Sequence, residues 1–251
     1  MAVETIGVLH PGEMGAAVAA VLRGQGLRVV WASPGRSAET RERAEAAGLD
    51  DVGTATEVAR CGVIFSICPP HAAVHVARSL GPFEGLYVDA NAVSPATAQE
   101  VAEVVRVAGG RFVDGGIVGP PPREAGSTRL YLSGDEAGTV AELFAGSVLD
   151  ARVVSNASAV KMAYAAWTKG TAAMLLAIRE LARREGVEEA LLEEWALSQP
   201  QLLDRHARAE RSADAKGWRW VGEMEEIAAT FEAGGLPGGF HRAAAEVYRR
   251  R

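Results

Sequence analysis

The residues that bear most directly on chemistry stand in one short turn, within the segment IGVLHPGEMG at residues 6–15. In dinucleotide-binding proteins a first strand leads into a G-x-G-x-x-G turn, and the next helix directs its N-terminus at the pyrophosphate. On that pattern Gly12 and Gly15 fill the second and third glycine positions, and His10 stands at the first. Gly12 lets the backbone approach the phosphates, and Gly15 lets the helix pack close to the strand. The turn therefore predicts a bound dinucleotide.

The same turn supplies the first candidate cofactor-binding residues. Pro11 restricts the backbone beside His10, where the first glycine would otherwise allow a tight turn. Two interpretations of the His10 ring stay open: it contacts a bound phosphate or substrate, or it points away from the site. The cofactor-binding residues predicted here are His10, Pro11, Gly12, Glu13 and Met14.

The segment VVWASPGRSAETRER at residues 29–43 bears on the choice between NAD and NADP. An acid about 20 residues after the glycines binds the ribose 2′-hydroxyl of NAD. Here Ser33 stands at the expected strand end, and no acid follows before Glu39. Arg36 and Ser37 offer a cation and a hydroxyl, which suit a 2′-phosphate. The segment favours NADP over NAD, unless Arg36 is an ordinary solvated surface charge.

These turns require a framework of alternating strands and helices, and the first 154 residues supply it. Short apolar runs predict strands at Thr5–Leu9, Arg28–Ala32, Val63–Ser66, Leu86–Asp89, Arg111–Val113 and Arg129–Ser133. Amphipathic stretches predict helices at Ala38–Gly48 and Ser94–Gly110, the second with Ser94 as N-cap and Pro95 at the first helical position. Alternation with short connections predicts a parallel sheet with helices on both faces.

After residue 154 the strand signals stop. Ser158–Gly186 predicts one long helix that ends in basic residues and a glycine, and further helical patterns follow. The expected fold class is α/β: a Rossmann-type doubly wound sheet over residues 1–154, then a smaller all-helical domain over residues 155–251. Ligands of open α/β sheets bind beyond the carboxyl ends of the strands, so the site is expected there.

Composition and charge narrow the class of function. The 251 residues are 48% hydrophobic and 23% charged, and the formal net charge of −6 has both signs interleaved, unlike a nucleic-acid binder. No apolar run approaches the roughly 20 residues that span a bilayer, and the N-terminus enters a strand without a signal segment. Cys61 and Cys68 are too few for a disulfide framework or a zinc site. We expect a cytoplasmic protein with a small-molecule substrate and no metal, membrane or nucleic-acid partner.

Five segments resemble landmarks of the β-hydroxyacid dehydrogenase family, which is related to 6-phosphogluconate dehydrogenase and to imine reductases. They are HPGEMG, CPPHAA, VDANAVSPATA, VDGGIVGPPP and KMAYAAWTKG, and the resemblance covers essentially the whole chain. More narrowly, the chain resembles a subgroup of phosphogluconate dehydrogenase-like NAD-binding proteins. In that subgroup the histidine at His10 is a shared feature rather than a broken turn.

The resemblance implies further cofactor contacts. ICPPHAAV at residues 67–74 matches the loop over the nicotinamide ribose, and VDANAVSP at residues 88–95 matches a strand end beside the nicotinamide. The implied cofactor residues are Cys68, Pro69, Pro70 and Asn91. Cys68 as a nucleophile would need a base that nothing in the sequence places beside it, so a small buried thiol is the preferred interpretation.

FVDGGIVGP at residues 112–120 matches the family's substrate motif, whose usual form is D-A-P-V-S-G-G. The resemblance implies substrate binding by Gly116, Val118 and Gly119. Val118 takes the serine position, and Pro120 removes the next backbone donor. This departure argues against an ordinary 3-hydroxy acid as the substrate.

Lys161 stands at the family's catalytic lysine position, near the start of the long helix. Hydride transfer from a carbinol carbon needs a base for the hydroxyl proton, and the reverse needs an acid; a desolvated lysine suits either role. The alternative is an ordinary solvated lysine. Ala165 replaces the family's substrate-binding asparagine, and Tyr164 or Thr168 is a candidate to supply that hydrogen bond. Trp220 either shapes an apolar substrate site or packs against the long helix.

The sequence thus predicts an NADP-dependent oxidoreductase that passes a hydride between nicotinamide and a small hydroxyl or carbonyl substrate. Two alternatives stay open. Imine reduction on the same scaffold fits the altered substrate motifs, although imine reductases generally replace the lysine. A non-catalytic dinucleotide-binding protein also fits those motifs. The apolar helix AAWTKGTAAMLLAIREL at residues 165–181, with the resemblance, implies a homodimer through the helical domain.

Overall fold

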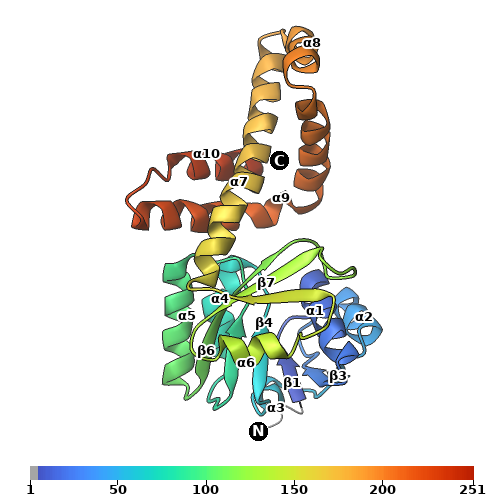
Figure 1. Cartoon of the computed structure of the whole chain (residues 1–251), viewed down its shortest axis with the longest axis vertical. Coiled ribbons are helices and arrows are strands. Elements are labelled where there is room, and N and C mark those ends of the chain that lie inside the picture. The colour runs from blue at the N-terminus through green and yellow to red at the C-terminus, as the bar shows by residue number, and fades with distance from the viewer. Residues whose placement is uncertain (1–4) are drawn as a thin grey trace. The chain divides into compact units, whose positions relative to one another are not determined.

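The computed structural model describes residues 5–251 and divides into two compact units, the first ending at Lys161 and the second beginning at Met162. The first unit contains a sheet flanked by helices, and the second contains helices (Figure 1). The predicted fold class, a Rossmann-type α/β sheet followed by a helical part, is confirmed.

One sheet of eight strands organises the first unit, in the order β3-β2-β1-β4-β5-β6-β7-β8 among the described residues. The strands are β1 (Thr5–Val8), β2 (Arg28–Trp31), β3 (Asp50–Asp51), β4 (Val63–Ser66), β5 (Leu86–Asp89), β6 (Arg111–Val118), β7 (Thr128–Ser133) and β8 (Leu149–Val153). Strands β1 to β6 are parallel and follow the strand order of dinucleotide-binding folds.

The prediction of a parallel sheet throughout is wrong for β7. Only residues 119–127 connect β6 to β7, whereas a parallel return needs a crossover of about a dozen or more residues. The chain therefore folds straight back, and β7 pairs antiparallel to β6 with Gly116 opposite Tyr131. The sequence also gave no sign of the two-residue strand β3 or of β8, which is parallel to β7.

Two layers of helices cover the sheet. They are α1 (Glu13–Gly24), α2 (Ala38–Ala46), α3 (Ala55–Val58), the 3₁₀ turn η1 (Pro70–Ala72), α4 (Ala73–Ser79), α5 (Pro95–Val107) and α6 (Ala137–Glu142). Successive strand residues point to opposite faces. In β4, Val63 and Phe65 join a core with α1, α2 and α6, whereas Ile64 joins a second core with α3, α4 and α5. The fold is doubly wound for this reason.

The first turn of α7 (Ala157–Arg184) is fixed to the sheet. The Ala157 N–H donates to Ser133 Oγ at 2.8 Å. Ser158 donates to the Asp114 carboxylate through its N–H at 2.8 Å and through its Oγ at 2.5 Å. Because these bonds attach α7 to β6 and β7, the first unit continues to Lys161. The boundary predicted after residue 154 falls in the loop between β8 and α7.

The second unit consists of the rest of α7 with α8 (Glu188–Ser198), α9 (Gln201–Ala233) and α10 (Gly239–Arg249). The Trp220 ring on α9 packs edge-on against Tyr248 on α10, with ring centroids 5.1 Å apart. The Tyr248 hydroxyl donates to the Lys169 carbonyl on α7 at 2.6 Å, and the Lys169 ammonium pairs with Glu223 on α9. These contacts join three helices into one core. The Lys169–Glu223 pair was not found from the sequence, because its partners lie on different helices.

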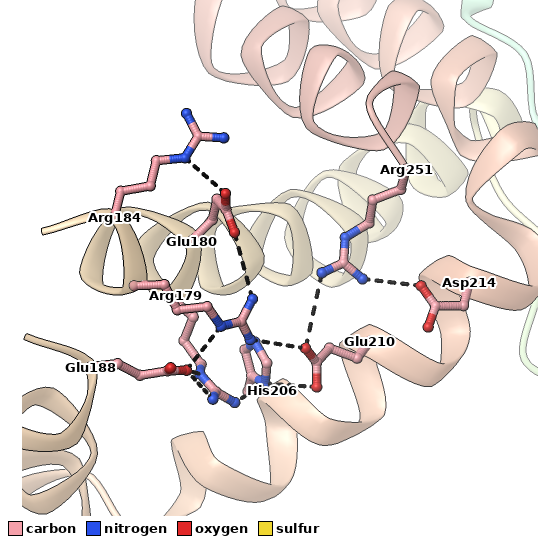
Figure 2. Close-up of polar contacts among 9 residues, drawn as sticks. Arg179, Glu180, Arg184, Glu188, His206, Glu210, Asp214 and Arg251 are labelled. Carbon is pink, nitrogen blue, oxygen red and sulfur yellow. Dashed lines mark hydrogen bonds and ion pairs between the residues drawn. The ribbon is translucent and has the colours of Figure 1, made fainter. Parts of the chain in front are cut away.

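A polar network joins α7, α8 and α9 (Figure 2). Arg179 pairs with Glu188 and lies 2.9 Å from Nδ1 of the buried His206, and Glu210 lies 3.4 Å from the same nitrogen. Burial lowers the pKa of His206, so its ring is neutral at pH 7 and accepts a hydrogen bond from Arg179. Through Arg179 of α7, the network connects Glu188 on α8 to His206 on α9.

Candidate functional site

The strand order creates a switch point between β1 and β4. From β1 the chain passes to β2 on one side, and after β3 it crosses to β4 on the other. The loops after β1 and β4 therefore diverge and leave room beyond the carboxyl ends of the strands. The predicted cofactor segments, residues 10–14 and 68–70, follow these two strands. The structure thus brings both segments to one edge of the sheet.

The two glycines of the turn have different surroundings. A Cβ on Gly15 would lie 2.3 Å from the His10 carbonyl oxygen, so only glycine fits this contact between α1 and the turn. Gly12 is the N-cap of α1, and a Cβ there would meet no protein atom within 4 Å. No protein atom therefore crowds the N-cap of α1, as an anion-binding helix N-terminus requires. Pro11 is buried, Glu13 is exposed and Met14 packs against the first core.

His10 is half-buried, and its Nδ1 finds no hydrogen-bond partner among residues 5–251. Burial, followed by the charge of Arg36, lowers the pKa of His10 to about 4. The ring is therefore neutral at pH 7 and offers a hydrogen-bonding nitrogen rather than a positive charge. Such a nitrogen suits a hydroxyl group better than it suits a phosphate that needs a cation.

Arg36 is drawn back toward the same turn. Its Nη2 donates to the Leu9 carbonyl at 3.4 Å, and its Nε is buried without a partner among the described residues. Burial lowers the pKa of Arg36, although an arginine stays charged at neutral pH. The side chain is half-buried, so it is not a freely solvated surface charge.

A small cavity of about 40 Å³ lies beside these two side chains. His10, Arg36 and Ser79 are its polar lining residues. The apolar lining residues are Leu9, Ala32, Ala55, Val58, Val76 and Leu80. At about 40 Å³ the cavity is too small to enclose the adenosine of a dinucleotide, so these residues would line only one edge of its site. The open space at Gly12 fits its phosphates. The residues present therefore fit a dinucleotide.

Ser33 and Ser37 are held by other parts of the chain. Ser37 caps α2, its Oγ accepting the N–H of Thr40 at 3.2 Å. The Ser33 N–H donates to the carboxylate of Asp51 at 3.1 Å. Asp51 belongs to β3 and was missed by sequence reasoning. No acid stands at the end of β2 itself, but the neighbouring strand β3 places Asp51 beside Ser33.

Asn91 holds the loop after β4 in place. It is buried, its Oδ1 accepts the Cys68 N–H at 2.5 Å, and its Nδ2 donates to Ser66 Oγ at 3.3 Å. Pro69 and Pro70, which follow Cys68, lead the loop into η1. Burial, followed by the charge of Asp89, raises the pKa of the Cys68 thiol to about 12. Cys68 is therefore a thiol at neutral pH, which does not suit a nucleophile.

Lys161 lies on α7 against β6. Its Nζ donates to the Ile117 carbonyl at 2.7 Å. The helix approaches this closely because Gly116 has no side chain: a Cβ there would lie 2.9 Å from the Lys161 Cβ and 3.0 Å from the Ala157 carbonyl oxygen. Burial lowers the pKa of Lys161 to about 8. The amine is therefore desolvated, and both of its protonation states are accessible near neutral pH.

Asp114 determines where this lysine sits, and sequence reasoning missed it as well. Its carboxylate accepts two hydrogen bonds from Ser158 and one from Ser133, at the N-terminus of the helix that carries Lys161. A carboxylate at a helix N-terminus also interacts favourably with the helix dipole. In the sequence, this role of Asp114 was indicated only by the presence of an acid within the VDGG segment. Its partner Ser158 lies 44 positions further along the chain.

The other predicted substrate residues of the first unit shape the backbone. Val118 is buried at the end of β6, with an exposed fraction of 3%. Gly119 has φ +123°, and a Cβ there would lie 2.4 Å from the Ser127 carbonyl oxygen. Gly119 is therefore required by the turn between β6 and β7, whatever else it does.

The substrate residues predicted in the second unit are exposed or make contacts within and between helices. Tyr164 is 47% exposed, and the Thr168 hydroxyl donates to the Tyr164 carbonyl of its own helix at 3.3 Å. Trp220 packs on Tyr248, and the Lys169 ammonium lies 5.7 Å from its ring centroid. Packing between helices therefore accounts for Trp220, and substrate roles for Tyr164 and Thr168 stay predictions.

Two searches over residues 5–251 gave negative results. No group of three or more His, Cys, Asp or Glu side chains is arranged to hold a metal ion. None of the helices in this range combines the length and apolar character that a membrane crossing demands.

Comparison with known proteins finds a family model that matches part of the chain, one curated relative and several solved structures of similar fold. Residues 182–251 match the domain of unknown function DUF1932. A curated relative, the "uncharacterized 28.5 kDa protein in 7S RNA 5′region" of Methanothermus fervidus, is 29% identical over 164 residues. That match covers 63% of this chain and 63% of the relative, so the chain spans less than two thirds of the relative's length.

Three solved structures resemble the chain along nearly its whole length. A conserved protein described as structurally similar to 3-hydroxyacid dehydrogenases is 28% identical, with a TM-score of 0.70 over 98% of this chain and 96% of that one. A 3-hydroxyisobutyrate dehydrogenase of Salmonella typhimurium is 19% identical, with a TM-score of 0.73 over 98% and 93%. A reductive aminase of Aspergillus terreus, solved with an NADPH-type cofactor, is 18% identical, with a TM-score of 0.62 over 99% and 93%.

Proposed function

Since the chain has a β-hydroxyacid dehydrogenase-like fold that ends in a DUF1932 segment, we propose that it is an NADP-dependent oxidoreductase. It passes a hydride between the nicotinamide and a small substrate that carries a hydroxyl or carbonyl group. Lys161 is the general acid and base of the reaction. The other site residues of the first unit bind the dinucleotide or hold its loops.

The observation that carries this proposal is the environment of Lys161. The amine is desolvated, its pKa is lowered to about 8, and a hydrogen bond of 2.7 Å fixes it on the Ile117 carbonyl. A group that exchanges its proton near neutral pH suits proton transfer to or from a substrate oxygen. Perturbed pKa values of this kind cluster at functional sites.

Four residues support the cofactor assignment. Gly12 and the start of α1 would hold the pyrophosphate, and Arg36 would hold the 2′-phosphate that distinguishes NADP from NAD. His10, neutral at pH 7, would offer its nitrogen to a hydroxyl of the nucleotide, while Asn91 keeps the loop after β4 in place. A bound nicotinamide supplies or accepts the hydride. The reductive aminase of similar fold was solved with an NADPH-type cofactor, in agreement with this choice.

The chain's own part in the reaction is proton transfer. As an ammonium, Lys161 donates a proton to the carbonyl oxygen while that oxygen gains negative charge during reduction. As a free amine, it accepts the hydroxyl proton during oxidation. Asp114 holds the start of α7 and so keeps the amine in place through both directions.

Imine reduction is the second candidate, because a reductive aminase shares the fold. Val118 and Pro120, which replace the family's substrate-binding donors, fit an unusual substrate of this kind. The retained Lys161 favours an oxygen substrate, since an ammonium matches the charge that develops on oxygen. A dinucleotide-binding protein without turnover is the third candidate. This candidate gives no role to the desolvated amine of Lys161.

The first experiment is titration of the purified chain with NADPH and NADH, followed by turnover with a panel of keto acids, aldehydes and cyclic imines. We expect tighter binding of NADPH than of NADH, and NADPH oxidation with at least one carbonyl compound. Turnover of imines alone would favour the second candidate, and NADPH binding without any turnover would favour the third. Binding of neither nucleotide would refute the cofactor assignment.

We also propose that the protein is a homodimer through its second unit. A groove of about 550 Å³ in that unit is lined mainly by apolar residues of α7 and α10. Trp167, Met174 and Phe240 on this groove are 63%, 53% and 72% exposed. Apolar surface of this extent normally marks an interface, and the sequence resemblance implies that its occupant is a second copy of the chain.

If the groove is the dimer interface, a charged side chain placed in it should weaken the dimer. Met174→Glu should produce monomers in sedimentation or light-scattering measurements, because a carboxylate would be buried without a partner. Leu197→Glu is the matched control, since Leu197 is 82% exposed on α8 and does not line the groove. A wild-type monomer, or equal behaviour of the two variants, would argue against this interface.

A further inference from the structure

The residues SPGR at positions 33–36 form a tight turn that carries the arginine of the cofactor site. The Arg36 N–H donates to the Ser33 carbonyl at 3.0 Å. Pro34 stands at the second position of the turn, and Gly35 at the third has φ +74°. This is the pattern of a type II turn, which needs proline's fixed φ and a glycine with positive φ. The direction in which Arg36 leaves the backbone is therefore set by the turn.

The start of this turn is held by Asp51. In the sheet, Trp31 at the end of β2 pairs with Asp51 on β3. The Asp51 Oδ1 accepts the N–H of Ser33 at 3.1 Å and the N–H of Gly53 at 2.9 Å. A hydrogen bond from the Ser33 side chain, followed by the two backbone hydrogen bonds and the charge of Arg41, holds the pKa of Asp51 below its usual value, so the carboxylate is ionised at neutral pH.

The far end of the turn reaches the dinucleotide loop. The Arg36 guanidinium donates to the Leu9 carbonyl at 3.4 Å, next to His10. Three segments are thus connected in series: β3 through Asp51, the turn through Ser33 and Arg36, and the loop after β1. A shift of Ser33 would move the backbone from which Arg36 extends.

We propose that Asp51 is a positioning residue that sets the preference for NADP over NAD by holding the turn that presents Arg36. This inference rests on the proposed cofactor. The charge of Asp51 by itself would oppose a 2′-phosphate, since like charges repel. Its contribution to NADP binding is therefore made by accepting backbone hydrogen bonds, and it acts through Arg36.

The test is the ratio of NADPH to NADH dissociation constants in two variants of one residue. Asp51→Ala removes the acceptor, and we expect NADPH binding to weaken roughly tenfold while NADH binding changes little, as loss of hydrogen bonds to a charged group would cause. Asp51→Asn keeps an Oδ1 acceptor and removes the charge. Its ratio should stay closer to that of the wild type than to that of the alanine variant.

Two further variants show whether the effect passes through the arginine. In an Arg36→Ala background, Asp51→Ala should cause little further change in the ratio, because the two residues act as one unit. Asp50→Ala is the control on the same strand. The Asp50 side chain pairs with the exposed Arg28, so its loss should leave the ratio unchanged.

The outcomes separate this inference from the proposed function. If the wild type binds neither nucleotide, the cofactor assignment fails and the inference fails with it. If the wild type prefers NADPH and Asp51→Ala keeps that ratio, the inference alone is overturned. A rise in NADPH affinity in Asp51→Ala would also overturn it, because the charge and not the hydrogen bonds would then dominate.

Discussion

Replacing Lys161 by methionine is expected to lower kcat for NADPH oxidation by about 10²–10⁴-fold, the usual contribution of a positioned general acid. Methionine preserves most of the apolar stem of the lysine and removes only the group that exchanges protons. Dissociation constants for NADPH should stay near those of the wild type, because the dinucleotide loops after β1 and β4 do not include this residue. Thermal unfolding should change little, since the desolvation cost of the amine is removed together with its bond to Ile117.

The pH dependence follows from the same lysine, whose pKa is lowered to about 8 by burial. Reduction requires the ammonium, so kcat/KM for reduction should fall as pH rises through about 8. Oxidation requires the free amine, so kcat/KM for oxidation should rise over the same interval. The pH profiles of kcat/KM for reduction and oxidation therefore slope in opposite directions near pH 8. Both slopes should disappear in Lys161→Met. Initial rates between pH 6 and pH 10, measured in both directions, provide the test.

Other results would count against this role. Lys161→Arg keeps a positive charge but cannot release its proton, so it should fail in oxidation even if some reduction remains. An arginine variant that oxidises substrate at the wild-type rate would show that the charge alone matters. A methionine variant with unchanged kcat would remove Lys161 from the mechanism.

Gly15→Ala is expected to lose stability, whereas Gly12→Ala is expected to lose affinity for NADPH. Both substitutions add one methyl group to the same turn. At Gly15 the new Cβ would lie 2.3 Å from the His10 carbonyl oxygen, so β1, the turn and α1 must separate. Overpacking against backbone that cannot rotate away costs about 3 kcal/mol, which is a large part of a domain's stability. Chemical denaturation should show this loss directly.

Gly12→Ala should fold normally. Its backbone has φ −70° and ψ −170°, which alanine adopts freely, and its Cβ would meet no protein atom within 4 Å. The methyl group would enter the space where the pyrophosphate approaches α1, so NADPH affinity should fall by at least about tenfold while the unfolding transition stays in place. Normal NADPH binding by Gly12→Ala would mean that the dinucleotide does not use this turn. A stable Gly15→Ala would mean that His10 can move aside, and that the turn is less tightly packed than its geometry indicates.

The sequence by itself determined those features that depend on neighbouring residues. Strands β4 and β5 lie at the predicted residues, because each is a short apolar run between helical patterns. Ser94 caps α5, with its Oγ accepting the Thr97 N–H at 3.2 Å, and Pro95 occupies the first turn as its restricted φ requires. The glycine turn before α1 was likewise predicted from spacing, and so were the candidate cofactor residues of that turn. Family resemblance, rather than periodicity, singled out Lys161.

Only the tertiary structure decided the features that depend on residues far apart in the chain. A direct return without a crossover helix made β7 antiparallel, and pairing with β2 made Asp51 the acid beside Ser33. The bond between Asp114 and Ser158 fixed the start of α7, and the absence of a side chain at Gly116 let Lys161 reach Ile117. Burial then lowered the pKa of the amine. Helical and strand periods, caps and turns are encoded within a few residues, whereas desolvation and pairing arise only when separate elements pack together.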